Sequence, residues 1–240
     1  MELGDVVPAA MTKPLNVLLD TCLWNESVTH DYYMVRREIQ RGGTKHYISI
    51  AELQPRRLRG KTLAQSHEIF EAMRNVARLD ESGRIRLYDT TELMFEWMGR
   101  PIGPWRKTEH DLFRNVRISR LRPPVERTVV FGGLYFNDDF KDQKRRWLES
   151  IQEPRFAELK RVIDRKHWAD AFHLWTAEAH QLDCVLTLET KFRNNLANQK
   201  KLTTMVEILS PSELAARFRP GYILKRKLRS FAMGLLGRDD

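Results

Sequence analysis

The sequence predicts a three-layer α/β/α fold, in which helices cover both faces of a central, mainly parallel sheet of about five strands. Two observations indicate this class. Short apolar runs recur along the 240 residues, and they are apolar on both faces, as the strands of a buried parallel sheet are. Longer segments whose apolar residues have helical spacing separate these runs, which gives the alternating order of a right-handed wound sheet.

The expected elements follow in chain order. The runs predicted to be strands are residues 15–20, 46–50, 84–89, 183–188 and 205–209. Residues 62–79 and 167–181 place apolar side chains three and four positions apart, which predicts two amphipathic helices. After the last strand, Pro211 marks the start of a further helix, because proline is favoured in the first helical turn.

One long segment, residues 92–160, interrupts this alternation and is predicted to be an insertion that decorates the sheet. Within it, the stretch TVVFGGLYF at 128–136 is expected to form an extra strand or a hairpin arm. Trp97 and Trp105 lie near arginines in the same segment. These two side chains could stack on single-stranded bases or pack in the core.

The main domain is expected to span residues 1–216 and to be followed by a basic tail at 217–240. The tail contains apolar residues that step by four, three and four, which predicts an amphipathic helix: Leu224, Leu228, Phe231 and Leu235. Such a helix could lie on RNA, on a protein partner or on a membrane surface, or pack its apolar side on the core.

Charge and composition narrow the class of protein. With 41 Lys and Arg against 32 Asp and Glu, the net charge of +9 favours a polyanion such as nucleic acid, although acidic proteins and membrane surfaces attract the same charge. No stretch reaches the ~18 unbroken apolar residues of a membrane span, and the first residues lack a secretory signal pattern. Cys22 and Cys184 match no metal-binding spacing and are expected to be buried free thiols. We therefore expect a cytoplasmic protein without an integral membrane segment.

Four carboxylates are predicted to meet at one edge of the sheet. Parallel strands end at a common edge, where open α/β sheets bind their ligands. Asp20 ends the first strand, Glu52 follows the second and Glu189 follows the fourth. The helix at 167–181 runs antiparallel to the strands, so Asp170 in its first turn is expected above the same edge.

These carboxylates would repel one another unless a cation held them together. Oxygen ligands favour hard ions such as Mg²⁺ or Mn²⁺, which can activate water for phosphodiester hydrolysis. Taken singly, each acid also has an ordinary explanation as a turn residue, a helix-dipole partner or a surface ion pair. The prediction of a metal site therefore depends on their convergence.

The segments that carry these acids resemble the PIN domain nucleases. The run NVLLDTCLW, with Asp20, is similar to the opening motif of the family, and YISIAEL would supply Glu52 as its second acid. The most specific block is ADAFHLWTAEAHQLDCVLTLETKF, which carries Asp170 and Glu189, and VEILSPSEL resembles the closing strand and helix start. The resemblance covers residues 14–91 and 164–216.

The resemblance implies a ribonuclease in which the catalytic acids Asp20, Glu52, Asp170 and Glu189 hold Mg²⁺ or Mn²⁺ and Thr187 supports the metal site. Thr187 could equally be an ordinary buried strand residue. Many members are toxins of bacterial toxin–antitoxin pairs, so RNA, an antitoxin-like protein and a homodimer are the expected partners. Two features depart from the family: Glu189 stands where members usually have Asp, and the insertion makes the chain longer than toxin-type members.

Other residues near the expected site have more than one explanation. A basic run after Glu52 could grip the phosphate backbone or form a solvated face: Arg56, Arg57, Arg59 and Lys61. His173 follows Asp170 by three residues and could be a ligand, a base or a hydrogen-bonded buried histidine.

Two other functions stay open. The chain could be a PIN-like RNA-binding or scaffold module without catalysis, which Glu189 and the insertion favour. An unrelated nucleotide-binding α/β protein has less support, because DTCLWNESV rather than a glycine-rich loop follows the first strand.

Overall fold

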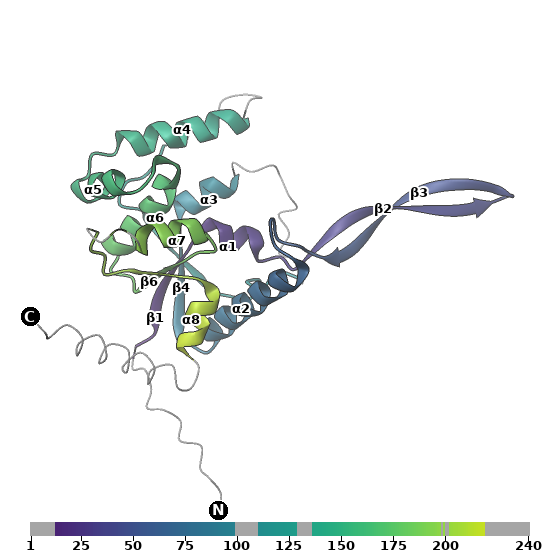
Figure 1. Cartoon of the computed structure of the whole chain (residues 1–240), viewed down its shortest axis with the longest axis horizontal. Helices are drawn as coiled ribbons and strands as arrows, with labels where there is room; N and C mark the ends of the chain where they lie inside the picture. The colour runs from purple at the N-terminus through teal and green to yellow at the C-terminus, as the bar shows by residue number, and fades with distance from the viewer. Residues whose placement is uncertain (1–12, 99–109, 129–135, 198, 200–201, 219–240) are drawn as a thin grey trace, which may run out of the picture.

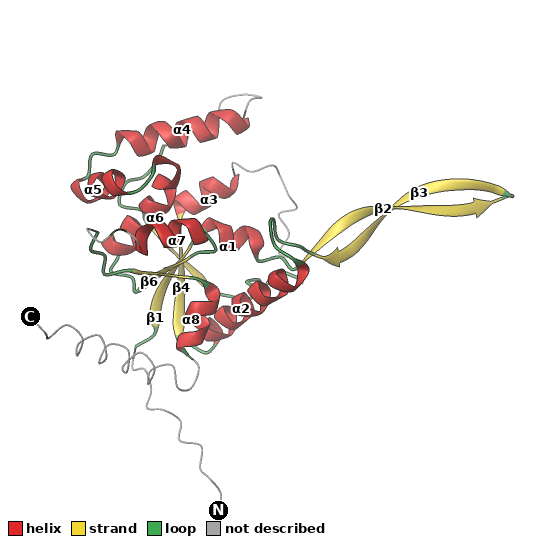
Figure 2. Ribbon diagram, in the orientation of Figure 1, coloured by secondary structure: helices red, strands yellow, loops and turns green. Residues whose placement is uncertain are grey.

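The computed structural model describes residues 13–98, 110–128, 136–197, 199 and 202–218. Its centre is a five-stranded parallel sheet with the strand order β5-β4-β1-β6-β7. These strands are β1 (Leu15–Leu19), β4 (Ile85–Thr90), β5 (Ile118–Leu121), β6 (Cys184–Leu186) and β7 (Glu207–Leu209). Helices cover both faces of the sheet, which confirms the predicted three-layer α/β/α class (Figure 2).

The helices connect these strands and flank the sheet (Figure 1). They are α1 (Thr21–Glu26), α2 (Leu63–Glu81), α3 (Thr91–Met98), α4 (Phe136–Ser150), α5 (Pro154–Val162), the 3₁₀ turn η1 (Arg165–His167), α6 (Trp168–Ala179), α7 (Thr190–Ala197) and α8 (Pro211–Arg217). The predicted helices at 62–79 and 167–181 correspond to α2 and to η1 with α6. Pro211 is the first residue of α8, where a capping box fixes the helix start.

The alternation of side chains along β1 divides the core into two layers. Leu18 packs in one cluster with residues of α5 and α6. Val17 and Leu19 pack in the other cluster with residues of α2 and α8. Asp20 follows Leu19 directly, so the same alternation turns its side chain towards the Leu18 side of the sheet. The fold therefore places Asp20 under the helices that follow β4 and precede β6.

A long antiparallel hairpin leaves the body between α1 and α2 (Figure 1). It consists of β2 (His30–Arg41) and β3 (Thr44–Pro55), which pair along their whole length. Gly42 and Gly43 form the turn with φ values of 62° and 80°, which the two-residue turns of hairpins favour. The predicted buried strand at 46–50 is therefore wrong, because this segment lies in an exposed hairpin outside the parallel sheet.

The predicted insertion also needs correction. Residues 92–160 contain nearly all of α3, the whole of β5 and of α4, and most of α5. Because β5 pairs with β4 as an edge strand of the sheet, the segment is in part a component of the fold and not only a decoration. Most of the expected extra strand at 128–136 lies outside the described residues, as do Trp105 and the tail after Phe218.

Two further expectations can be compared with the described part of the chain. None of its helices has both the length and the apolar character that crossing a membrane requires. Both cysteines are free thiols: Cys184 is buried, whereas Cys22 is half-buried.

Candidate metal centre

Asp20 is held in place from the neighbouring strand. It occupies the position before α1, but its side chain does not cap that helix. Instead its Oδ2 accepts a hydrogen bond of 2.6 Å from the hydroxyl of Thr187, which follows β6. The Thr187 hydroxyl in turn accepts the backbone N–H of Glu189 at 3.0 Å, so its own proton is left for Asp20. Thr187 therefore holds Asp20 in place, and its support of a metal site stays a prediction.

A second donor reaches the same oxygen of Asp20. The thiol of Cys22 lies 2.9 Å from Asp20 Oδ2 and itself accepts the backbone N–H of Leu188 at 3.2 Å. Burial and the negative charge of Asp20 raise the pKa of Cys22 well above its ordinary value. The thiol is therefore a neutral donor that orients the carboxylate.

Glu96 is an acid of the site that the sequence analysis missed. It lies on α3, which begins directly after β4, and its side chain is 13% exposed. Its carboxylate accepts hydrogen bonds from Thr21 and from His173, and forms an ion pair with Lys144 of α4. Burial opposes ionisation, but Lys144 and His173 hold the pKa of Glu96 well below its ordinary value.

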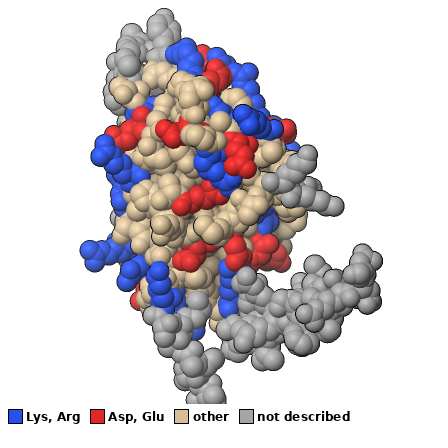
Figure 3. Space-filling view, turned by 90° about the vertical axis from the view of Figure 1, so that its left-hand side faces the viewer, with Lys and Arg blue, Asp and Glu red and all other residues tan. Residues whose placement is uncertain are grey.

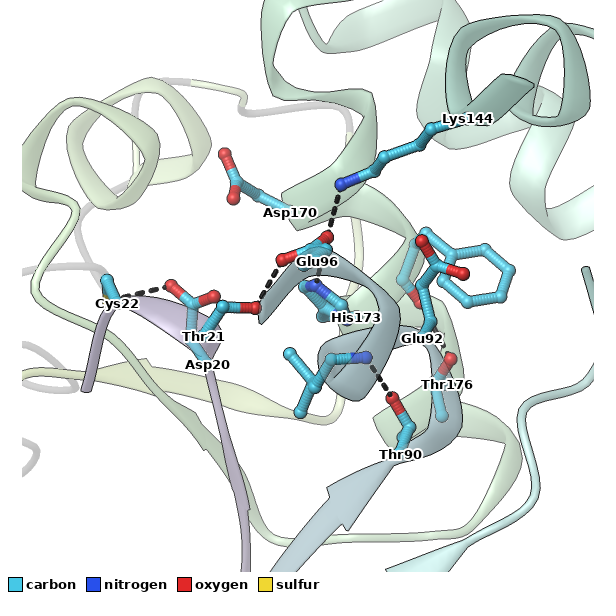
Figure 4. Close-up of polar contacts among 12 residues, drawn as sticks. Asp20, Thr21, Cys22, Thr90, Glu92, Glu96, Lys144, Asp170, His173 and Thr176 are labelled. Atoms are coloured by element: carbon cyan, nitrogen blue, oxygen red, sulfur yellow. Dashed lines mark hydrogen bonds and ion pairs between the residues drawn. The ribbon is translucent and has the colours of Figure 1, made fainter. Parts of the chain in front are cut away.

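His173 completes a cluster of three potential metal ligands. It lies in the middle of α6, and its Nε2 is 3.2 Å from Glu96 Oε1. One donor atom each of Asp20, Glu96 and His173 lies within 4.8 Å of the others (Figure 4). Burial lowers the pKa of His173, but the interactions with Glu96 and Asp20 together raise it above its ordinary value. The three side chains come from the ends of β1, from α3 and from α6, so only the folded sheet brings them together.

Asp170 lies beside this cluster, one turn before His173 on α6 (Figure 4). Its Oδ2 is 3.0 Å from Nδ1 of His167. Burial and the charge of Asp20 raise the pKa of Asp170 to about 6. The charge of Asp20 therefore acts on Asp170, and the predicted role of Asp170 as a metal ligand stays a prediction.

Glu52 and Glu189 do not join the cluster that the described residues form. Glu52 lies on β3 of the hairpin, where it forms an ion pair with Arg37 on the opposite strand. Its assignment as a metal ligand is wrong, because the strand that was expected to carry it to the sheet edge is not part of the sheet. Glu189 does follow β6, but its side chain is exposed and its backbone N–H binds Thr187.

Glu92, the second acid of α3, is paired with Arg127 and does not belong to the cluster. Glu92 forms a buried ion pair with Arg127 at 3.1 Å, with side chains 2% and 3% exposed. Figure 4 shows its carboxylate directed away from Asp20. Of the two acids on α3, only Glu96 therefore faces the site.

The basic run after β3 serves the structure in part. Arg56 contacts Glu26 and Asp31 at 3.2 Å each and donates to the carbonyl of Asn25, which ties the hairpin base to α1. Arg57 donates from Nε to the carbonyl of Lys61 at 2.6 Å. These contacts account for Arg56 without a ligand. The side chains of Arg57, Arg59 and Lys61 are exposed, and phosphate binding there stays a prediction.

In comparisons with known proteins, no protein-family model, no curated protein and no solved structure matches the chain.

Replacing Thr187 by Val tests the support of Asp20. The variant keeps the size of the side chain but removes the donor to Asp20 Oδ2, and we expect Mn²⁺ affinity to fall about 10- to 100-fold, as for other residues that orient metal ligands. Isothermal titration measures this change. Thr176→Val is the matched control, since Thr176 is also buried but donates to the carbonyl of Phe172. Equal losses in both variants would contradict a specific role of Thr187.

Proposed function

We propose that this protein is a metal-dependent nuclease that hydrolyses phosphodiester bonds of RNA, with its ion held by Asp20, Glu96 and His173. The observation that supports this function is the cluster of three donor atoms within 4.8 Å of one another, at the edge where the parallel strands end. Asp170 stands beside the cluster as a further carboxylate. The resemblance of the segments around Asp20 and Asp170 to the PIN domain nucleases supports the same activity.

The donor set favours Mn²⁺ over Mg²⁺. Two carboxylates suit either ion, but an imidazole nitrogen is a poor ligand for Mg²⁺ and an acceptable one for Mn²⁺ or Zn²⁺. The oxygen-only set expected from the sequence becomes a mixed set, because His173 takes the place that was assigned to Glu52. Such an ion, when bound, supplies an activated water and stabilises the charge that develops on the phosphoryl group.

The residues around the cluster have separate tasks in this proposal. Thr187 and Cys22 fix one oxygen of Asp20, which leaves its other oxygen for the ion. His167 orients Asp170, whose raised pKa of about 6 suits a group that accepts a proton near neutral pH. Lys144 forms an ion pair with Glu96. When an ion binds the Glu96 carboxylate, the Lys144 ammonium can bind a phosphate oxygen instead.

The net charge of +9 favours RNA as the polyanion. The positions of the charged side chains indicate which surface the RNA contacts. On the side away from the hairpin, Lys and Arg are interspersed with Asp and Glu (Figure 3). That side therefore offers no uniform basic field among the described residues. We propose that the exposed Arg59 and Lys61, on the segment between the hairpin and α2, contact the phosphate backbone of the RNA.

The proposal is tested by incubating the purified chain with a labelled pool of single-stranded RNA and Mn²⁺, Mg²⁺, Zn²⁺ or EDTA. We expect cleavage with Mn²⁺, weaker cleavage with Mg²⁺ and none with EDTA. Cleavage that persists in EDTA would contradict a metal-dependent mechanism. A chain that binds Mn²⁺ but leaves every RNA of the pool intact would contradict general RNA hydrolysis.

A second function is favoured by one observation, the ion pair of Lys144 with Glu96. Lys144 and His173 already compensate the buried charge of Glu96, so the cluster could be a structural network in a module without catalysis. Isothermal titration with Mn²⁺ distinguishes the two functions. A nuclease of the proposed kind binds the ion, whereas a structural network gives no heat of binding.

The affinity for Mn²⁺ should depend on pH. An ion displaces the protons of its ligands and of neighbouring acids, and Asp170 binds a proton below a pKa of about 6. The pKa of His173 is also raised, so its proton is a further competitor of the ion. We expect the affinity to be lower at pH 5 than at pH 7 by at least about tenfold, measured by titration in matched buffers. Asp170→Asn should flatten part of this dependence, and an equally steep profile in that variant would refute the role of Asp170.

A further inference from the structure

The hairpin extends away from the body of the protein (Figure 1). It exposes large apolar side chains on both of its faces. Those exposed by more than a third are Tyr32, Tyr33, Met34, Ile39, Tyr47, Ile48, Ile50 and Leu53. A lone two-stranded hairpin is marginally stable in water and leaves both edges open to another chain. This exposure indicates a partner that covers part of the hairpin.

The register assigns these residues to two faces, because paired residues share a face and neighbours along a strand alternate. On one face, the pair Val35–Ile50 lies beside Ile48 at the middle of the hairpin. Tyr33 lies on the base side of this centre and Ile39 on the tip side. We call this surface, formed by these five side chains, the aliphatic face.

The opposite face has a different distribution. Tyr32, Met34 and Leu53 lie towards its base, whereas Tyr47, which donates a hydrogen bond to Glu38 and lies under Arg36, is nearer the tip. Towards the tip it carries Glu38 and Lys45, which form an ion pair at 2.8 Å. The two halves of this face therefore differ in polarity, and it cannot match a second copy of itself in an antiparallel arrangement.

Nucleic acid is a poor partner for the hairpin. The basic residues between His30 and Pro55 exceed the acidic ones by only one. Arg37 is paired with Glu52, and Arg36 lies over the ring of Tyr47 at 4.3 Å. β-branched aliphatic side chains at the centre of a surface favour a protein partner over phosphates.

We propose that the aliphatic face is a dimer interface, which packs antiparallel against the same face of a second copy of this chain. The charges at its ends support this partner. Asp31 lies on this face at the base, and Arg41 lies on it at the tip. An antiparallel arrangement brings the tip of one hairpin over the base of the other, so each Arg41 approaches the partner's Asp31. The same arrangement brings His46 towards the partner's Glu52.

The size of the face predicts a weak dimer. Strands of 12 residues extend about 40 Å, and a two-stranded ribbon is about 10 Å wide, so the two faces together bury roughly 800 Å². This area is below the ~1,200–2,000 Å² of stable interfaces, so we expect dissociation in the micromolar range, at about 1–100 μM.

Sedimentation of the full chain over about 1–100 μM tests the dimer. We expect a concentration-dependent dimer for the unaltered chain and a monomer for Ile48→Lys with Ile50→Lys, because four like charges would face one another across the interface. Met34→Lys with Tyr47→Lys adds the same charge to the opposite face and should leave the dimer intact. A monomer at every concentration, or equal loss of the dimer in both double variants, would overturn the proposal.

Disulfide cross-linking tests the antiparallel arrangement separately. When Tyr33→Cys and Ile39→Cys chains are mixed and oxidised, we expect cross-links between the two kinds of chain. In the antiparallel arrangement, position 33 of one hairpin faces position 39 of the other. Cross-links formed equally well within each single variant would indicate parallel or edge-to-edge pairing and would overturn the arrangement. The unaltered chain is the control for Cys22 and Cys184. Neither experiment depends on nuclease activity.

Discussion

In the Asp20→Asn variant, the affinity for Mn²⁺ and the rate of RNA cleavage are each expected to fall by more than about 100-fold. This loss exceeds the one expected when a residue that only orients a metal ligand is replaced. The amide lacks the negative charge that an ion requires. Its oxygen can still accept from Thr187 and Cys22, the two donors to Asp20 Oδ2, so the fold should stay nearly intact.

Cleavage of the RNA pool and titration with Mn²⁺ measure the two losses, and urea unfolding checks the fold. Glu52→Gln is the matched control, because it removes one negative charge from the hairpin, outside the parallel sheet. The control should cut RNA as the unaltered chain does. Full cleavage by Asp20→Asn, or an equal loss in Glu52→Gln, would reject the assignment of the site.

The Glu96→Gln variant should lose metal binding and also stability, by about 3 kcal/mol, because removing one partner of a buried ion pair leaves the other charge uncompensated. The remaining charges are those of Lys144 and His173, with side chains 22% and 2% exposed. The stability loss distinguishes Glu96 from Asp20, whose known contacts are hydrogen bonds that an amide can keep.

Urea unfolding of Glu96→Gln and of Glu96→Gln with Lys144→Met measures this effect. The second substitution removes the orphaned ammonium, so the double variant should regain a good part of the stability but not the metal binding. A single variant as stable as the unaltered chain would show that Lys144 and His173 do not depend on Glu96.

The sequence was sufficient to predict the parts of the site that lie in strongly patterned elements. Asp20 ends an apolar run and Asp170 lies in the first turn of an amphipathic helix, and both positions follow from local periodicity. His173 follows Asp170 by three residues, which places the two side chains on one side of α6. The carboxylate that His173 contacts belongs to Glu96 on α3, and the local sequence pattern did not indicate this helix.

Glu52 was misplaced because HYISI has the composition of a buried strand. Gly42 and Gly43 lie between two β-prone runs, and this is a hairpin signal that could have corrected the prediction. Glu96 was missed for a related reason. The break in the apolar alternation predicts one insertion over residues 92–160, so it gives no sign that a helix after β4 carries an acid to the sheet edge. The strand β5 has only four residues, partly exposed, and gives no clear apolar run.

The hairpin enters and leaves the body at one place, since His30 and Pro55 are paired at its base. Once the hairpin has formed, the connection from α1 to α2 therefore costs less loop-closure entropy than its number of residues suggests. The hairpin can close by itself through contacts between residues close in sequence, and only the short remaining loop must then be ordered when β4 pairs with β1. The sheet can therefore fold in the same way whether the hairpin is long, short or absent. Changes in the hairpin can alter its partner without moving Asp20 at the end of β1.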